Sequence, residues 1–355
     1  MNLIEYLLLY KDKSFKDMPF NEVDALALAD FSYVDFEALG LNKDRVEGST
    51  LVDLIDAYRP TPQDSERKLN YLKVARFICE GKRYAGANFA HFRKVRDENA
   101  DKQFQAITII FKDFIYISYC GTDSTTLGWK EDFNMAILEM VPSEIEAIKY
   151  ANMVANKHWF RRIYLGGHSK GGRLAISAAK GMNNKRRIAA IFSFDAPNYP
   201  SSFYDSDYKK IDSLVLAYAP NESIIGRLMN EYHQKKVVKS TNTLLMQHDT
   251  FSWVIDHRSF AYDYGYTEKS TRIVTTINHT LIENDEETKH QFIDTLFDYF
   301  DRLGIDKLPN EKEFLGFFLK RIPSVVGEWR NTPKESRTVV KKIIFELLKD
   351  YFFNK

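Results

Sequence analysis

Cysteine is scarce in this sequence of 355 residues, which contains only Cys79 and Cys120. Two thiols in a chain of this length do not form the disulfide framework of a secreted module, so we expect a reducing, cytoplasmic environment. An excess of charge is also lacking, because 50 Lys and Arg residues balance 49 Asp and Glu residues to a net charge of +1. This balance excludes a strong long-range field toward nucleic acid or anionic membranes, so partners must be recognised at local sites.

Long hydrophobic runs are absent as well, since no stretch approaches the roughly 20 apolar residues of a membrane-spanning helix. The N-terminal segment, MNLIEYLLLYKDKSF, has no basic residues before its apolar run and no small-residue cleavage site after it. We therefore predict an amphipathic helix there and not a signal peptide. Internal repeats, Cys/His metal-binding spacings and glycine-rich dinucleotide motifs are missing too, so no metal and no cofactor are expected.

Patterns typical of helices and of strands alternate between residues 21 and 218. Helical spacing of apolar residues predicts helices over Asn21–Leu39, Ser65–Glu80, Ser143–Trp159 and Lys170–Gly181. Runs of β-branched and aromatic residues predict strands over Asn88–Val95, Gln103–Phe111, Phe114–Tyr119, Ile163–Leu165, Ile188–Phe194 and Leu214–Tyr218. Strands separated by helices imply right-handed crossovers, and hence an α/β fold with a mostly parallel central sheet.

Beyond Ser252 the sequence pattern changes. It is mainly helical, with candidate helices at Glu287–Leu303, Glu311–Arg321 and Lys334–Phe353. We expect a core over residues 1–260 with an N-terminal helical preface, and a C-terminal helical extension over residues 261–355 that can pack as part of the same domain. The short basic clusters at 185–187 and 235–236 adjoin apolar strands, and we interpret them as solvated loop ends. A nucleic-acid partner is therefore not expected.

The segment Gly167-His168-Ser169-Lys170-Gly171 has the pattern G-x-S-x-G between a predicted strand and a predicted helix. In a nucleophile elbow, glycines on both sides of a strained serine leave room where side chains would strike neighbouring backbone. The alternative is a phosphate-binding loop, which needs a Lys followed by Ser or Thr after its last glycine. Here Gly172 is followed by Arg173 and Leu174. The pattern therefore predicts an α/β-hydrolase fold with Ser169 as nucleophile.

About fifty residues upstream, the segments Cys120–Asp123 and Trp129–Asp132 resemble the R-G-(S/T) turn and the W-x-x-D motif of class 3 lipases, the fungal triacylglycerol lipase family. The whole chain resembles a bacterial family of unknown function with an α/β-hydrolase fold that is related to those lipases. The resemblance implies that Thr122 stabilises the oxyanion together with the backbone N–H of Lys170. Cys120 stands where those lipases usually have Arg, so a structural ion pair of the family is missing here.

The same resemblance implies a lid near residues 123–141. The apolar side chains of Leu127–Val141 are the candidates for contact with an acyl chain, in particular Trp129, Phe133 and Leu138. Such a lid would also allow peripheral contact with a membrane. The alternative is an ordinary surface helix that buries the same apolar face against the core.

The catalytic base is expected after the nucleophile, because the triad of this fold runs in the order Ser, acid, His. Later histidines are His233, His248, His257, His279 and His290. We choose His248, which ends an apolar run at a polar turn, and the related family has the same Q-H-D followed by a Trp, here Trp253. His168 adjoins the serine on a sharp elbow, where neighbouring side chains point apart, so we expect a packing role for it.

Two carboxylates compete for the role of the acid. Class 3 lipases have an Asp after the strand at Leu214–Tyr218, and the nearest carboxylate here is Glu222, although a gapless match puts Ser223 at that position. The alternative is Asp195, which directly follows the strand at Ile188–Phe194. Either would orient the imidazole and stabilise its protonated form. We prefer Glu222.

Together these residues predict a Ser-His-acid esterase or lipase that acts on a small-molecule or lipid ester through an acyl-enzyme. A thioesterase, peptidase or acyltransferase would use the same site. A non-catalytic binding protein with this fold is the third hypothesis, because the acid is ambiguous and Cys120 departs from the family pattern.

Overall fold

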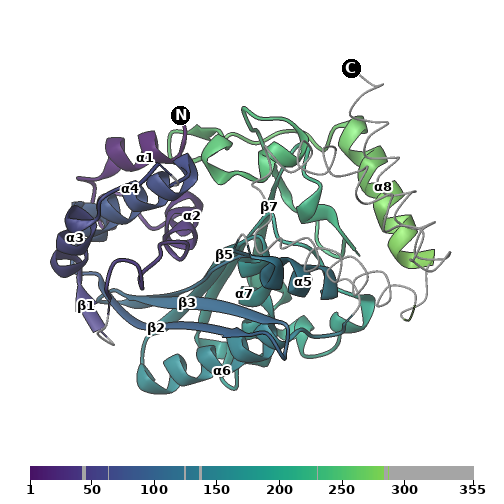
Figure 1. Cartoon of the computed structure of the whole chain (residues 1–355), viewed down its shortest axis with the longest axis horizontal. Coiled ribbons are helices and arrows are strands. Elements are labelled where there is room, and N and C mark those ends of the chain that lie inside the picture. The colour runs from purple at the N-terminus through teal and green to yellow at the C-terminus, as the bar shows by residue number, and fades with distance from the viewer. Residues whose placement is uncertain are drawn as a thin grey trace.

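An eight-stranded sheet forms the centre of the molecule (Figure 1). The computed structural model describes residues 1–283 and residue 287, apart from residues 42–44, 63, 124, 136, 137 and 230. The strands lie side by side in chain order: β1 (Arg45–Glu47), β2 (Asn88–Asp97), β3 (Lys102–Ile110), β4 (Phe114–Tyr119), β5 (Arg162–His168), β6 (Ile188–Phe194), β7 (Val215–Pro220) and β8 (Lys236–Val238). Strand pairs from β1 to β4 are antiparallel, and those from β4 to β8 are parallel. The predicted α/β fold with a mostly parallel sheet is confirmed.

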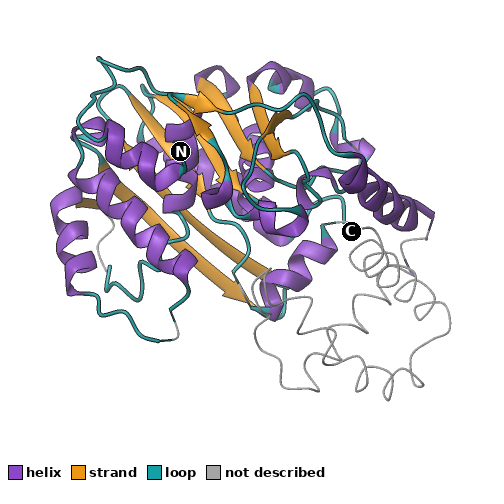
Figure 2. Cartoon of the chain, turned by 90° about the horizontal axis from the view of Figure 1, so that it is seen from above, coloured by secondary structure: helices purple, strands orange, loops and turns teal. Residues whose placement is uncertain are grey.

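Helices cover both faces of this sheet (Figure 2). They are α1 (Leu3–Tyr10), α2 (Glu22–Phe31), α3 (Gly48–Ala57), α4 (Glu66–Glu80), α5 (Thr126–Asn134), α6 (Pro142–Lys157), α7 (Lys170–Gly181) and α8 (Glu268–Glu283). Side chains of a strand alternate between the two faces of its sheet. In β4, Ile115 and Ile117 pack with α6 and α7, whereas the Tyr116 hydroxyl donates to the Ala25 carbonyl of α2 at 2.9 Å. The core therefore has three layers, with the sheet in the middle.

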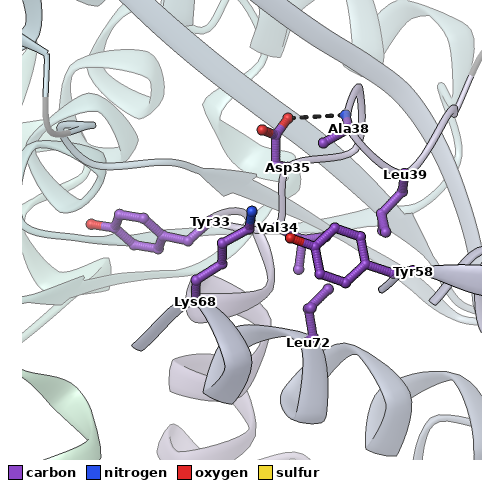
Figure 3. A pocket seen from close by; sticks show the side chains of 8 residues that line it. All are labelled: Tyr33, Val34, Asp35, Ala38, Leu39, Tyr58, Lys68 and Leu72. Atoms are coloured by element: carbon purple, nitrogen blue, oxygen red, sulfur yellow. Dashed lines mark hydrogen bonds between the residues drawn. The ribbon is translucent and has the colours of Figure 1, made fainter. Parts of the chain in front are cut away.

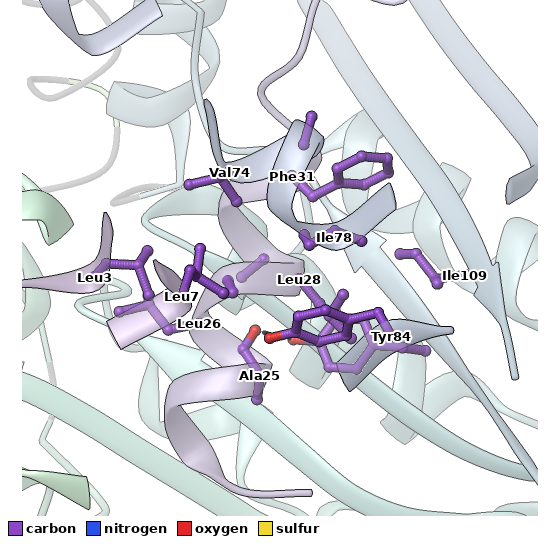
Figure 4. Close-up of a cluster of buried hydrophobic side chains, with 14 of the residues drawn as sticks. Leu3, Leu7, Ala25, Leu26, Leu28, Phe31, Val74, Ile78, Tyr84 and Ile109 are labelled. Carbon is purple, nitrogen blue, oxygen red and sulfur yellow. Dashed lines mark hydrogen bonds between the residues drawn. The ribbon is translucent and has the colours of Figure 1, made fainter. Parts of the chain in front are cut away.

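The N-terminal helices pack tightly on one face. Figure 4 shows the apolar cluster that they share with the sheet, with labelled side chains Leu3, Leu7, Ala25, Leu26, Leu28, Phe31, Val74, Ile78, Tyr84 and Ile109. Helix α2 begins at a capping box, in which the Asn21 side chain accepts from the N–H groups of Val23 and Asp24. It ends at Phe31 and not at the predicted Leu39, because the Ser32 hydroxyl donates back to the Ala29 carbonyl and the chain turns.

The boundary predicted at residue 260 does not coincide with a break in packing. Ala261 accepts from the N–H of Lys239 at 2.8 Å, and the N–H of Asp263 donates to Val237 at 2.9 Å. Helix α8, which the sequence pattern did not single out, packs through Ile273 and Val274. The candidate helices Glu311–Arg321 and Lys334–Phe353, and Glu287–Leu303 beyond its first residue, lie outside the described residues. Within the described residues, no helix has both the length and the apolar character needed to cross a bilayer.

Candidate active site

Ser169 lies at a sharp bend between β5 and α7. Its φ of 57° and ψ of −132° are rare for a residue with a side chain, as expected of a strained nucleophile elbow. A Cβ on Gly167 would lie 2.3 Å from the Gly171 carbonyl carbon, and a Cβ on Gly171 would lie 2.2 Å from the Tyr119 oxygen. The two glycines of the motif are therefore required by close backbone packing around the serine.

The first turn of α7 points toward the serine. The N–H groups at the start of a helix have no intrahelical acceptor, so those of Lys170 and Gly171 are available to a developing negative charge. The Lys170 side chain points into the protein instead, where its ammonium donates to Gln103 and lies 3.1 Å from Glu131 Oε2. Sequence inspection assigned only the backbone of Lys170 and missed this buried ion pair.

His248 has a carboxylate partner, and that partner is Asp195. His248 Nδ1 lies 2.7 Å from Asp195 Oδ2, and only 1% of the Asp195 side chain is exposed. The other oxygen, Oδ1, accepts from the Ser223 hydroxyl at 2.5 Å, and the Ser223 Oγ in turn accepts from the N–H of Gly226. Ser223 occupies the position at which the lipase resemblance places the acid. Its hydroxyl instead donates to Asp195, the carboxylate that follows the neighbouring strand β6.

Glu222, the acid that sequence reasoning preferred, has a different set of partners. Its Oε2 accepts from the N–H of Leu244 at 2.9 Å, and its own N–H donates to the Gln247 side chain at 2.8 Å. These bonds hold the short 3₁₀ helix Leu244–His248 against the end of β7. In the structure the carboxylate bonded to His248 is that of Asp195, the alternative acid, whereas the Glu222 carboxylate bonds the Leu244 backbone.

Ser169 and Asp195 directly follow the carboxyl ends of the adjacent strands β5 and β6, and His248 bonds Asp195. His168 of β5 pairs with Phe194 of β6, and Ser169 donates its N–H to the Phe194 carbonyl at 2.9 Å. The His168 and His248 rings have centroids 4.4 Å apart. Ser169, Asp195 and His248 therefore lie at one edge of the sheet, as expected for the carboxyl ends of parallel strands.

His168 packs beneath the site. The Tyr33 hydroxyl lies 3.0 Å from His168 Nδ1, and burial, followed by the nearby His248, lowers the pKa of His168 well below its ordinary value. Figure 3 shows Tyr33 among the residues that line a pocket beside α4, together with Tyr58, Lys68 and others. Neither Ser169 nor His248 lines that pocket, so we assign no substrate to it.

Thr122 donates its hydroxyl to Asp132 Oδ2, which joins the two motifs of the lipase resemblance. Burial raises the pKa of Asp132 to about 6, although Lys170 and Thr122 act in the opposite direction. Because Asp132 accepts the hydroxyl hydrogen of Thr122, the predicted oxyanion role of Thr122 would rest on its backbone N–H.

The proposed lid contains helix α5, whose inner side is anchored. Trp129, Phe133 and Leu138 are half-buried, whereas Glu131 is fully buried. The Glu131 carboxylate accepts from the N–H groups of Gln103 and Ser143 and pairs with Lys170. These contacts favour the alternative of a packed helix over a lid that moves as a unit.

Lys235 is buried and bonds two backbone carbonyls close to Asp195. The Lys235 ammonium donates to the carbonyls of Ala196, at 2.6 Å, and Gly226, and its pKa is lowered to about 8 by burial. The prediction that 235–236 is a solvated loop end is therefore wrong for Lys235 and holds only for the exposed Lys236. Within the described residues, no group of three or more His, Cys, Asp or Glu side chains is arranged to hold a metal ion.

Comparisons with solved structures find lipases at low similarity. Native Rhizomucor miehei lipase in complex with its propeptide is 13% identical, with a TM-score of 0.33 over 44% of this chain and 57% of that one. A fungal lipase–inhibitor complex is 11% identical, with a TM-score of 0.38 over 67% of this chain and 80% of that one. Similarity at this level carries no argument about activity.

Among curated proteins, the iron–sulfur cluster assembly protein SufB of Plasmodium falciparum is 22% identical over 236 residues, covering 60% of this chain and 47% of SufB. The chain thus spans about half the length of that relative, and we transfer no activity from it. The Mbeg1-like family profile matches residues 78–298, a range that includes Ser169, Asp195 and His248. That the relatives are bacterial stays a prediction. Because the match covers more than half of the sequence, the chain belongs to the Mbeg1-like family.

Proposed function

We propose that this protein is a serine hydrolase that cleaves carboxylic esters, with Ser169 as nucleophile, His248 as general base and Asp195 as the acid. One observation carries the proposal: the buried Asp195 bonds His248 Nδ1 at 2.7 Å beside a serine held at positive φ on a strand–helix elbow. A carboxylate on Nδ1 fixes the imidazole tautomer, so that Nε2 is the nitrogen left to accept a proton.

The proposed reaction has two halves. His248 Nε2 takes the Ser169 hydroxyl proton while Oγ attacks the ester carbonyl, and the N–H groups of Thr122 and Lys170 stabilise the oxyanion. The tetrahedral intermediate collapses, the alcohol leaves with the proton from His248, and an acyl-serine remains. Water then attacks this acyl group with His248 again as base, which releases the carboxylic acid and restores the serine. Asp195 stabilises the imidazolium in both halves.

We propose a small-molecule or lipid ester as the substrate. The half-buried Trp129, Phe133 and Leu138 of the 123–141 segment are the candidate side chains for contact with its acyl chain. No metal or cofactor enters the proposed chemistry. A mobile lid is not part of the proposal, because Glu131 anchors α5 from within.

A fluorophosphonate probe tests the nucleophile directly. We expect covalent labelling of the wild type and none of Ser169→Ala, with circular dichroism showing that both proteins are folded. Soluble esters, thioesters and amides of matched acyl chains then test the reaction type, and we expect esters to react fastest. Faster turnover of thioesters or amides would replace the ester assignment. A folded wild type that neither reacts with the probe nor hydrolyses any ester would sink the proposal in favour of a binding protein.

A further inference from the structure

Two adjacent aromatic side chains protrude at the end of α6. Trp159 is 75% exposed and Phe160 is 66% exposed, and their rings are almost perpendicular, with centroids 5.6 Å apart. By contrast, Trp253 is completely buried. A single exposed aromatic residue needs no explanation, but a contiguous pair of large ones on a turn marks an interaction site. We call residues 159–162 the aromatic turn.

The aromatic turn is held rigidly. The Arg187 guanidinium donates to the carbonyls of Ala155 at 2.6 Å, of Arg161 at 2.8 and 3.0 Å, and of His158. The N–H of Arg161 also donates to His158 at 3.1 Å. Three backbone carbonyls thus accept from the half-buried Arg187 guanidinium, so little further conformational entropy is lost when the two rings bind a partner.

Positive charge surrounds the base of the aromatic turn. The Arg161 guanidinium lies over the Phe160 ring, 5.1 Å from its centroid, and bonds the Lys112 carbonyl at 3.4 Å. Arg162 is exposed at the start of β5, and the other exposed bases in this neighbourhood are Lys112, Lys157 and Arg186. Asp113 is the exposed acid next to Lys112. Since the whole chain carries a charge of only +1, this is a local concentration of bases.

We propose that the aromatic turn is a peripheral membrane-contact site for an anionic lipid surface. Trp favours the headgroup level of a bilayer, Phe is common among the apolar side chains that enter the boundary below it, and nearby bases attract acidic headgroups. Both rings are mostly exposed, which leaves them free to enter an interface. Its perpendicular rings could not both stack on consecutive bases of a nucleic acid, which makes that partner a poorer fit.

The location of the turn gives the proposal a consequence for substrate access. Arg162 pairs with Phe114 at the amino ends of β5 and β4, whereas Ser169 follows the carboxyl end of β5. Seven residues of extended chain separate these two edges by roughly 20 Å. A protein docked through this turn would hold its candidate active site away from the bilayer, in contrast to docking through the 123–141 segment.

Vesicle co-sedimentation with the full chain tests this inference independently of hydrolysis. We compare vesicles of phosphatidylcholine with vesicles containing about 30% phosphatidylglycerol, at low and high salt. The wild type should bind the anionic vesicles at least about tenfold more tightly, and Trp159→Ser/Phe160→Ser should lose at least about tenfold of that affinity. Tyr264→Ser, which alters a fully exposed aromatic residue elsewhere, is the matched control and should bind like the wild type.

Each other outcome overturns the proposal. Wild-type protein that ignores anionic vesicles, or a double variant that binds them as well as the wild type, excludes this membrane site. If the wild type does not bind vesicles but forms a dimer that dissociates in the double variant, the turn is a self-association site. If the wild type instead binds nucleic acid and the double variant does not, the turn is a nucleic-acid site. Reaction with a soluble ester should be equal in the wild type and the double variant, so failure of the hydrolase proposal would be seen separately.

Discussion

At the scale of single residues, the choice between Asp195 and Glu222 decides how the site works. Asp195 is buried, bonds His248 at 2.7 Å and is supported by Ser223. A Cβ on Gly226 would lie 2.1 Å from Asp195 Oδ1, so the turn after β7 is shaped around this carboxylate. Glu222 instead accepts from the backbone of Leu244. The two carboxylates should therefore respond very differently to neutralisation.

Replacing Asp195 by Asn is expected to lower kcat/KM for a soluble ester by about 10³–10⁴-fold, because the imidazole loses its charge partner and its enforced tautomer. Glu222→Gln is the matched comparison and should remain within about tenfold of the wild type, since an amide oxygen still accepts from Leu244. Steady-state kinetics on folded variants provide the measurement. Equal losses in the two variants would contradict the assignment of Asp195.

At the scale of elements, helix α5 is fixed to the core by a charge pair. Glu131 and Lys170 have at most 1% of their side chains exposed and lie 3.1 Å apart. A buried ion pair is costly to break from one side, because the remaining charge loses its partner without regaining water. The pair joins α5, in the candidate lid, to Lys170, the first residue of α7, so α5 and the bend at Ser169 should be stable together.

We expect Glu131→Gln to lower the free energy of unfolding by about 3 kcal/mol, because the buried Lys170 ammonium would lose the charge of its ion-pair partner. Urea denaturation measures the change. Glu80→Gln, which breaks the exposed pair between Glu80 and Arg76, is the control and should cost less than about 1 kcal/mol. If the two substitutions cost the same, α5 is not anchored in this way.

At the scale of the whole molecule, the N-terminal helices are hydrogen-bonded to the segment that carries His248, the proposed general base. Asp30, at the end of α2, accepts from the Thr250 hydroxyl at 2.7 Å, two residues after His248. The backbones of Met1 and Ile255 also exchange hydrogen bonds. Burial raises the pKa of Asp30 to about 8, with the Thr250 bond acting in the opposite direction.

This raised pKa gives the fold a pH dependence. Below about pH 4 the Asp30 carboxyl is protonated in both states, whereas between pH 4 and 8 only the unfolded chain releases the proton, so stability falls as pH rises through this window. Asp30→Asn removes that penalty. The unfolding free energies of both proteins are measured at pH 5 and at pH 8. The stability of the variant relative to the wild type should be higher at pH 8 than at pH 5 by at least about 2 kcal/mol.

Asp12→Asn is the control for this experiment, because Asp12 is exposed and water solvates its carboxylate in both states. It should leave the difference between the two pH values unchanged. A pH-independent difference between wild type and Asp30→Asn would show that Asp30 is ionised in the folded protein.

Local features of the sequence determined much of this protein. The bounds of β4, β6 and α7 agree with the predicted ranges, since each has an uninterrupted local pattern. The elbow at Ser169 was also predictable, because its requirement for Gly167 and Gly171 is expressed within five consecutive residues. The three-residue strands β1 and β8 were missed, since so short a segment has no periodicity to detect.

Only the tertiary structure decided which distant groups meet. The choice of Asp195 over Glu222, the pairing of Lys170 with Glu131 and the burial of Lys235 all depend on which strand ends and loops become neighbours. The spacing of residues along the sequence does not show these contacts, because a carboxylate that will be buried and one that will stay in solvent look the same in the sequence. What fixes its role is the loss of water around it and the identity of the group that replaces that water, and both arise only when the layers pack together.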